Sequence, residues 1–203
     1  MQALKLVDVE GSQSRKAPNL DYASTHKEVV ERCKHGNRQA QFELYRLYSR
    51  AMYNICLRML RNEQDAEDIL QRSFIDVFSH LDSFRYQSSI GAWIKRIVVN
   101  NCINHLKRNK VRFEEFEPRH AAVEDAPAQL REKAMEVERI KQAVGQLPDG
   151  YRAVFTLYLF EGYDHQEIAE IMGITEATSK SQLSRAKQKV KKLLTQEHTR
   201  SNR

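Results

Sequence analysis

The segment from Asp164 to Leu194 limits the possible folds most, because it has the pattern of two helices separated by a glycine turn. Asp164 followed by Glu167 is a capping-box pattern, in which each side chain accepts a hydrogen bond from a free backbone N–H of the first turn. Gly173 interrupts the first helical pattern, and Thr175 is an N-cap candidate for a longer second helix. A short helix, a tight turn and a longer helix form the helix-turn-helix pattern.

The longer helix is amphipathic and strongly basic. Six basic residues and one acid lie between Thr175 and Leu194, so phosphate groups would neutralise its surface. A solvated face of an ordinary helical bundle gives the same pattern, and both interpretations stay open at this point. The apolar side contains Leu183, Ala186, Val190, Leu193 and Leu194, and the side available to a DNA groove contains Thr178, Ser181, Gln182, Arg185 and Lys189.

Almost every other patterned segment also has helical period, and none shows a sustained strand alternation, so the predicted fold class is all-α. With 203 residues, the chain is long enough for one domain or two smaller ones. We expect helices at about 25–33, 40–60, 63–81 and 149–160. Two more helices are expected, one that begins at Ser88 or Ser89 and one that ends at Pro148.

A stretch without helical period divides the chain. Residues 113–131 contain two prolines and five acids and have no apolar face, which indicates a flexible acidic linker. Residues 1–24 also lack sustained periodicity and are expected to be a mobile tail. The predicted organisation is therefore two small helical domains, at 25–112 and 132–203, of which the second contains the helix-turn-helix.

The helix expected at 63–81 has two distinct sides. One side is apolar, and the other brings together Asp65, Asp68, Arg72 and Ile75. Acids near a helix N-terminus stabilise the helix dipole, which is one explanation for them. An exposed isoleucine beside acids in a basic protein is also typical of a helix that docks on another protein.

The segment from Phe84 to Phe113 combines aromatic, amide and basic residues. Aromatic side chains beside a basic groove are the combination that holds unstacked single-stranded bases, although Trp93 at helical spacing also suits a core position. Amides inside a helix are poor helix formers and indicate polar contacts, for which base edges are one candidate. The residues concerned are Phe84, Tyr86, Trp93, Lys95, Arg96, Asn100, Asn101, Asn104, Lys107, Arg108, Lys110 and Arg112.

The net charge of +6 favours an anionic partner such as nucleic acid or a membrane surface. Cys33, Cys56 and Cys102 are odd in number and lie in apolar patterns, so we expect buried free thiols in a reducing compartment. No second ligand pair follows Cys102 and His105 at zinc-site spacing, and no metal or other cofactor is expected. With neither a leader nor a membrane-length apolar run, a cytoplasmic location is predicted.

Two blocks of this chain resemble bacterial extracytoplasmic-function sigma factors, the two-domain specificity subunits of RNA polymerase. The first is DAEDILQRSFIDVF followed by FRYQSSIGAWIKRIVVNNCINHLKR, and the second is LPDGYRAVFTLYLFEGYDHQEIAEIMGITEATSKSQLSRAKQKVKKLL. They occur in the family's order across an acidic linker, and the likeness covers about residues 25–194. The resemblance implies a protein without catalytic activity that binds core polymerase and promoter DNA and takes no small-molecule substrate.

The resemblance also assigns roles to residues of the first domain. Asp65, Asp68, Gln71, Arg72 and Ile75 would dock on the clamp helices of the largest polymerase subunit. The basic and aromatic helix would melt and read the minus-ten element, and Phe84, Ile97 and Asn100 would form a pocket for a flipped base. The complete minus-ten set is Phe84, Trp93, Lys95, Arg96, Ile97, Asn100, Asn101, Asn104, Lys107 and Arg108.

In the second domain, the resemblance places the recognition helix in the major groove of the minus-thirty-five element. Three positions depart from the family pattern: Ala177 replaces a common Gly, Ser179 an apolar packing residue, and Gln182 a common Arg. We therefore expect weaker packing at Ser179 and leave the promoter sequence open. The minus-thirty-five set is Thr178, Lys180, Ser181, Gln182, Ser184, Arg185 and Lys189.

An inhibitory partner and two alternative functions are further hypotheses for this chain. Family members are commonly inhibited by an anti-sigma factor, often membrane-bound, so such a partner is a hypothesis for this chain. A free-standing regulator that binds duplex DNA and dimerises through its first domain is the second candidate. A DNA-cleaving recombinase is a third, but the sequence lacks a placed nucleophile or a cluster of metal-binding carboxylates.

Overall fold

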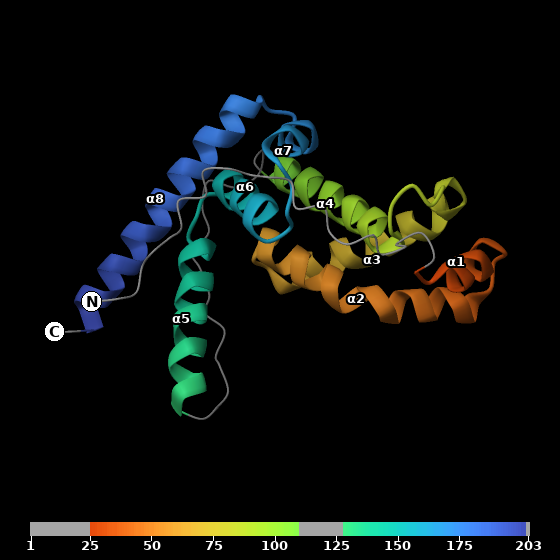
Figure 1. The fold of residues 1–203 in the computed structure, drawn as a ribbon, viewed down its shortest axis with the longest axis horizontal. Helices are drawn as coiled ribbons and strands as arrows, with labels where there is room; N and C mark the ends of the chain where they lie inside the picture. The colour runs from red at the N-terminus through yellow and green to blue at the C-terminus, as the bar shows by residue number, and fades with distance from the viewer. Residues whose placement is uncertain (1–24, 110–127, 202–203) are drawn as a thin grey trace.

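The computed structural model describes residues 25–109 and 128–201, and these residues are helical with no strand among them (Figure 1). The all-α prediction is confirmed. The tail at 1–24 and most of the linker predicted at 113–131 lie outside the described residues, and helix α5 already begins at Ala128. None of the helices in the described ranges is long and apolar enough to cross a membrane.

The first domain consists of four helices and a short 3₁₀ turn. These are α1 (Lys27–Lys34), α2 (Arg38–Leu60), α3 (Glu63–His80), η1 (Leu81–Ser83) and α4 (Ile90–Asn109). Side-chain oxygens of Asn37, Asn62 and Ser89 accept backbone N–H bonds and begin α2, α3 and α4. Helices α2, α3 and α4 pack on one another around a core that includes Leu44, Met59, Ile94 and Val98.

The three cysteines are free and buried in this domain, as the sequence predicts. The Sγ atoms of Cys56 in α2 and Cys102 in α4 are 3.7 Å apart. Both side chains behave as small apolar groups at the contact between these helices.

The second domain contains α5 (Ala128–Gly145), α6 (Asp149–Leu159), α7 (His165–Met172) and α8 (Glu176–Ser201). The predicted capping box of Asp164 and Glu167 is present, and Gly173 ends α7 with a φ of 68°. The hydroxyl of Thr175 accepts the N–H of Thr178 at 3.1 Å and begins α8. The helix-turn-helix is therefore formed as predicted, and α8 extends well beyond it (Figure 1).

The two domains contact each other through α2 and α4 on one side and α6 and α7 on the other. Arg152 of α6 is 5% exposed and carries the central contact. Its Nε donates to the carbonyl of Met59 in α2 at 3.0 Å, and its Nη1 donates to the carbonyl of Leu147 at 2.7 Å. A buried guanidinium needs such acceptors, so Arg152 holds the end of α2 against the start of α6.

Candidate nucleic-acid interface

The polar side of α3 faces solvent, as its pattern predicts. Asp68, Gln71 and Arg72 are exposed, and Ile75 is 66% exposed among them. Asp65 is partly covered, because its carboxylate lies 3.4 Å from Nε2 of His105 in α4. An exposed apolar side chain ringed by polar groups suits contact with another protein.

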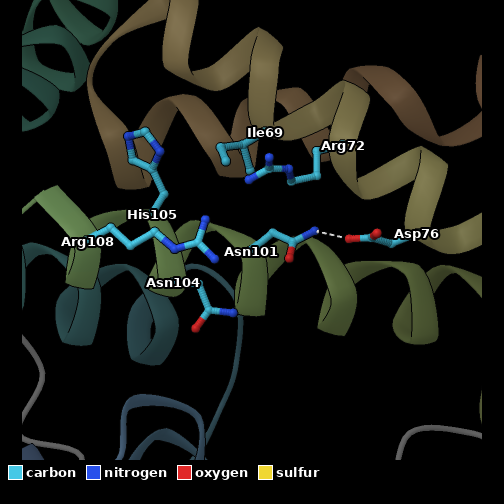
Figure 2. Close-up of a pocket in the computed structure, with 7 residues that line it drawn as sticks. All are labelled: Ile69, Arg72, Asp76, Asn101, Asn104, His105 and Arg108. Carbon is cyan, nitrogen blue, oxygen red and sulfur yellow. Dashed lines mark hydrogen bonds between the residues drawn. The ribbon is translucent and has the colours of Figure 1, made fainter.

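A polar pocket of about 270 Å³ lies between α3 and α4. It joins Arg72, which is predicted to dock on polymerase, with Asn101, Asn104 and Arg108, which are predicted to contact the minus-ten element. The guanidinium groups of Arg72 and Arg108 extend into it from the two helices (Figure 2). The pocket therefore marks the border between the two predicted surfaces, and it is lined by Ile69, Arg72, Asp76, Asn101, Asn104, His105 and Arg108.

The side-chain amide of Asn101 is bonded inside the protein. Its side-chain nitrogen donates to Asp76 at 2.8 Å (Figure 2). It also donates to the hydroxyl of Ser73 at 3.1 Å. Both partners are on α3, and Ser73 is fully buried. The Asn101 amide, which is predicted as a candidate for contact with base edges, thus connects α4 to α3 by hydrogen bonds in this structure.

The other residues of the minus-ten set differ in exposure. Asn100, Asn104, Arg96, Lys107 and Arg108 are exposed on α4, and Ile97 is half-buried beside them. These six side chains supply amide, cationic and apolar groups on one helix, the combination that base and phosphate contacts need.

Phe84 is 4% exposed and packs against two aromatic rings, with centroids 5.4 Å from Trp93 and 4.8 Å from Tyr86. The structure thus brings together the three aromatic residues that precede the basic residues of α4 in the sequence. In this state Phe84 belongs to the wall of an aromatic cluster and not to an open pocket.

Sequence reasoning did not predict the contacts that hold the loop before α4. Tyr86 has a φ of 58°, and its hydroxyl donates to Glu31 of α1 at 2.5 Å. Nζ of Lys34, also in α1, donates to the carbonyl of Phe84 at 3.1 Å and lies 4.8 Å from the centroid of the Tyr86 ring. Burial, followed by the bond to Glu31, raises the pKa of Tyr86. Glu31 and Lys34 are a charged pair three residues apart on a short helix, and this pattern alone does not predict contact with a distant loop.

The recognition helix α8 exposes a polar and basic face. Ser181, Ser184, Arg185 and Lys189 are exposed, and Lys180 is exposed but paired with Glu176 at 2.7 Å. Thr178 is half-buried, with its hydroxyl 2.8 Å from that of Thr175. Hydroxyl and guanidinium groups on one face of a helix in this motif suit contacts with bases and phosphates of a duplex.

Two departures from the family pattern, at Ser179 and Gln182, have different surroundings in the structure. Ser179 is fully buried, and its hydroxyl lies 2.9 Å from Nδ1 of His165 in α7. The packing cost expected from a serine here is offset by this hydrogen bond. Gln182 is half-buried, and its Oε1 is buried without a hydrogen-bond partner in the described structure, 3.6 Å from where a Cβ on Gly150 would lie.

Two family models match the chain in the order of its domains. Residues 44–112 match Sigma-70 region 2, and residues 137–190 match Sigma-70, region 4. The first match contains α3 and α4, and the second contains the helix-turn-helix.

Curated relatives match over most of their length. ECF RNA polymerase sigma factor SigM of Mycobacterium tuberculosis is 32% identical over 163 residues, covering 78% of this chain and 79% of that protein. RNA polymerase sigma-H factor of Pseudomonas aeruginosa is 31% identical over 181 residues, covering 82% of this chain and 92% of that protein.

Solved structures agree on the fold. Sigma factor RpoE of Bartonella quintana, crystallised with the anti-sigma factor NepR, has a TM-score of 0.53 at 22% identity and covers 75% of this chain and 95% of its own. CnrH in complex with the cytosolic domain of CnrY has a TM-score of 0.51 at 23% identity and covers 82% and 95%.

Proposed function

Because this chain belongs to the extracytoplasmic-function sigma factors of RNA polymerase, we propose a division of its promoter-recognition work among three surfaces. As a sigma factor, the protein binds core RNA polymerase and promoter DNA and serves transcription initiation. The residue roles within that function are the proposal. We also propose that the protein contributes no catalytic group of its own.

The first surface is the exposed side of α3, which docks on the clamp helices of the largest polymerase subunit. Ile75 is its apolar centre, and Asp68, Gln71 and Arg72 are its polar surround. Asp65 contributes at the edge, where it also pairs with His105. Such a small apolar patch with a polar rim has the anatomy of a protein-protein contact.

The second surface is α4 with the loop before it, which opens and reads the minus-ten element. The single observation that carries this assignment is the joint exposure of Asn100 and Arg96 beside Ile97 on one helix, next to the aromatic cluster of Phe84 and Trp93. An amide beside apolar walls can read the pairing edge of an unstacked base. Lys95, Asn101, Asn104, Lys107 and Arg108 complete this surface.

The third surface is the exposed face of α8, which enters the major groove at the minus-thirty-five element. Arg185 and Lys189 supply charge, and Ser181 and Ser184 supply hydroxyls. Thr178, Lys180 and Gln182 lie at its margin, since each has an internal contact or partial burial in the structure.

The test of docking is gel filtration of purified protein with core polymerase, followed by run-off transcription on upstream DNA from the source organism. We expect Asp68→Lys and Ile75→Glu to abolish co-elution and transcription. Glu170→Lys is the matched control, because Glu170 is exposed on α7 and its replacement gives the same charge change as Asp68→Lys. Failure of the wild-type protein to bind core polymerase would contradict the proposal, and so would equal loss in the control.

Regulation by an anti-sigma factor is a further part of the proposal. Of the two solved structures with this fold named above, one is a sigma factor in complex with the anti-sigma factor NepR, and the other is CnrH in complex with the cytosolic domain of CnrY. A membrane-anchored inhibitor of this chain should co-purify with tagged protein from uninduced cells. Full activity of the protein in cells, with no co-purifying partner, would argue against such an inhibitor.

A further inference from the structure

Glu161 is a carboxylate of the second domain that is buried against the first. It lies between α6 and α7, and its side chain is 6% exposed. Its Oε1 accepts a hydrogen bond from Nη2 of Arg58 in α2 at 2.6 Å. The Arg58 guanidinium also lies 5.8 Å from the centroid of the Phe160 ring. Since a buried carboxylate is costly without a cation, Glu161 requires Arg58 for as long as the domains touch.

A second cation of the first domain meets the same residue. Nζ of Lys95 in α4 donates to the backbone carbonyl of Glu161 at 2.8 Å and lies 5.0 Å from the centroid of the Tyr163 ring. Two cations from different helices thus converge on oxygens of one residue from the other domain. Arg and Lys side chains are also the groups that most often bind phosphodiester oxygens in nucleic-acid complexes.

The second domain covers α4 at its other end as well. A Cβ on Gly173 would lie 3.7 Å from Nζ of Lys107, which is on the same helix as Lys95. The two lysines are twelve positions apart, which corresponds to about 18 Å of helix. The second domain therefore contacts the helix assigned to the minus-ten element at Lys95 and approaches it again near Lys107.

We propose that Arg58 and Lys95 form a phosphate-binding site for single-stranded promoter DNA, and that Glu161 fills this site in the free protein and holds the two domains closed. The inference rests on the proposed function for α4. It adds Arg58 to the residues proposed to bind DNA, and it makes Glu161 a competitor of the DNA phosphate for the same cations. A DNA strand and Glu161 exclude each other because both use the same two cations.

The distance between the two promoter elements requires the contact between the two domains to open. Elements centred near positions minus ten and minus thirty-five are separated by about 25 base pairs, or roughly 85 Å at 3.4 Å per pair. Here α4 and α7 are in contact. The two DNA-reading helices therefore cannot occupy both elements until the bond between Glu161 and Arg58 breaks.

The first test measures binding of the full-length protein, without polymerase, to a fluorescein-labelled single-stranded oligonucleotide of random sequence by anisotropy. Glu161→Gln should tighten binding at least threefold, and adding Arg58→Ala should remove that gain. Glu170→Gln is the matched control, because it removes an equal charge from an exposed position on α7. Equal tightening by the two glutamine variants, or none by Glu161→Gln, would overturn the proposal.

The second test measures opening directly. The native cysteines are buried, so probes attached at Ser79→Cys on α3 and Gln188→Cys on α8, both exposed positions, report the distance between domains. Glu161→Arg should lengthen this distance, and the charge exchange Arg58→Glu with Glu161→Arg should restore it. An unchanged distance in Glu161→Arg, or no restoration by the exchange, would overturn the proposal.

Neither test uses polymerase, so the two proposals fail separately. If the wild-type protein binds core polymerase while Glu161 and Glu170 variants behave alike, only the masked phosphate site is wrong. If the Glu161 effects appear while Asp68→Lys and Ile75→Glu still bind core polymerase, only the assignment of the docking surface is wrong.

Discussion

At the scale of single residues, unusual conformations and buried polar groups have identifiable neighbours. Tyr86 adopts a left-handed backbone conformation, which costs a non-glycine residue on the order of 1–3 kcal/mol. Its hydroxyl bond to Glu31 and the contact of its ring with Lys34 compensate for this strain. The result is a fixed loop between η1 and α4, directly beside the residues proposed to read the minus-ten element.

The contact between Tyr86 and Glu31 predicts a pH dependence. The hydrogen bond from Tyr86, and next the contacts with Lys34, hold the pKa of Glu31 below its ordinary value of 4.5. A carboxyl with a lowered folded pKa stabilises the fold above pH 4.5 and loses this contribution as the pH falls through the folded value. We expect the urea midpoint of the wild-type protein to fall more steeply below pH 4.5 than that of Tyr86→Phe.

Tyr151→Phe is the control for this measurement, because Tyr151 is also half-buried and its hydroxyl has no hydrogen-bond partner in the described part of the chain. Its pH profile should follow the wild type. Superimposable profiles for all three proteins would show that the bond between Tyr86 and Glu31 does not contribute.

Substitution of Gln182 distinguishes a packing role of this side chain from a role in base reading. Its Oε1 is buried without a hydrogen-bond partner, and an unsatisfied buried acceptor costs about 1–3 kcal/mol. Gln182→Met should raise the free energy of unfolding by about 1 kcal/mol. Because Gln182 lies only at the margin of the α8 surface, promoter activity should change little. The control is Gln188→Met at an exposed position of the same helix. A loss of promoter activity confined to Gln182→Met would instead assign base reading to this residue.

At the scale of elements, the helix-turn-helix depends on a polar contact at its centre. His165 is bonded to Ser179, and its ring stacks on Tyr158 with centroids 4.6 Å apart. Burial, and next the charge of Lys180, lowers the pKa of His165 below its ordinary 6.5. A histidine with a lowered folded pKa stabilises the fold in its neutral form, so this stability is present above pH 6.5 and declines as the pH falls.

Removing one partner of this contact should loosen the angle between α7 and α8. Ser179→Ala leaves Nδ1 of His165 without its partner, and we expect the free energy of unfolding to fall by about 1 kcal/mol. Duplex DNA binding should weaken in parallel. His165→Leu combined with Ser179→Ala should recover part of the loss, since both polar groups are then gone, and the double-mutant cycle should give a coupling of about 1 kcal/mol. Strictly additive losses would show that the hydrogen bond has no energetic role.

At the scale of the whole molecule, the two domains have separate DNA tasks that single substitutions can distinguish. Arg185→Ala on α8 should weaken duplex binding and lower the slope of log K against log salt by about one unit if Arg185 contacts a phosphate. Asn100→Ala on α4 should leave closed-complex affinity nearly unchanged and impair strand opening, measured by permanganate reactivity of promoter thymines. Equal effects of both variants on closed-complex binding would contradict this division.

Local sequence patterns predicted the elements well because local chemistry decides them. The capping box at Asp164, the helix end at Gly173 and the cap at Thr175 are all found where the sequence pattern predicts them. The face of α3 with Asp68 and Ile75 follows in the same way from helical periodicity. These features need only residues within a few positions of each other.

Contacts between distant residues were beyond such reasoning. Glu31 and Tyr86, Ser179 and His165, and Glu161 and Arg58 pair across 55, 14 and 103 positions. Nothing in the spacing of one member indicates the other. The internal bonds of Asn101 likewise depend on how α4 lies against α3.

The sequence by itself therefore determined the helices, their apolar and polar sides, the order of the two domains and, through its motifs, the family. Only the tertiary structure decided which polar groups are satisfied inside the protein and which remain for a partner. The reason is physical: periodicity records which side of a helix is buried, whereas the partner of a buried charge or amide is set by how separate helices pack. Arg58 and Lys95, which meet at Glu161 from two helices, are the clearest instance.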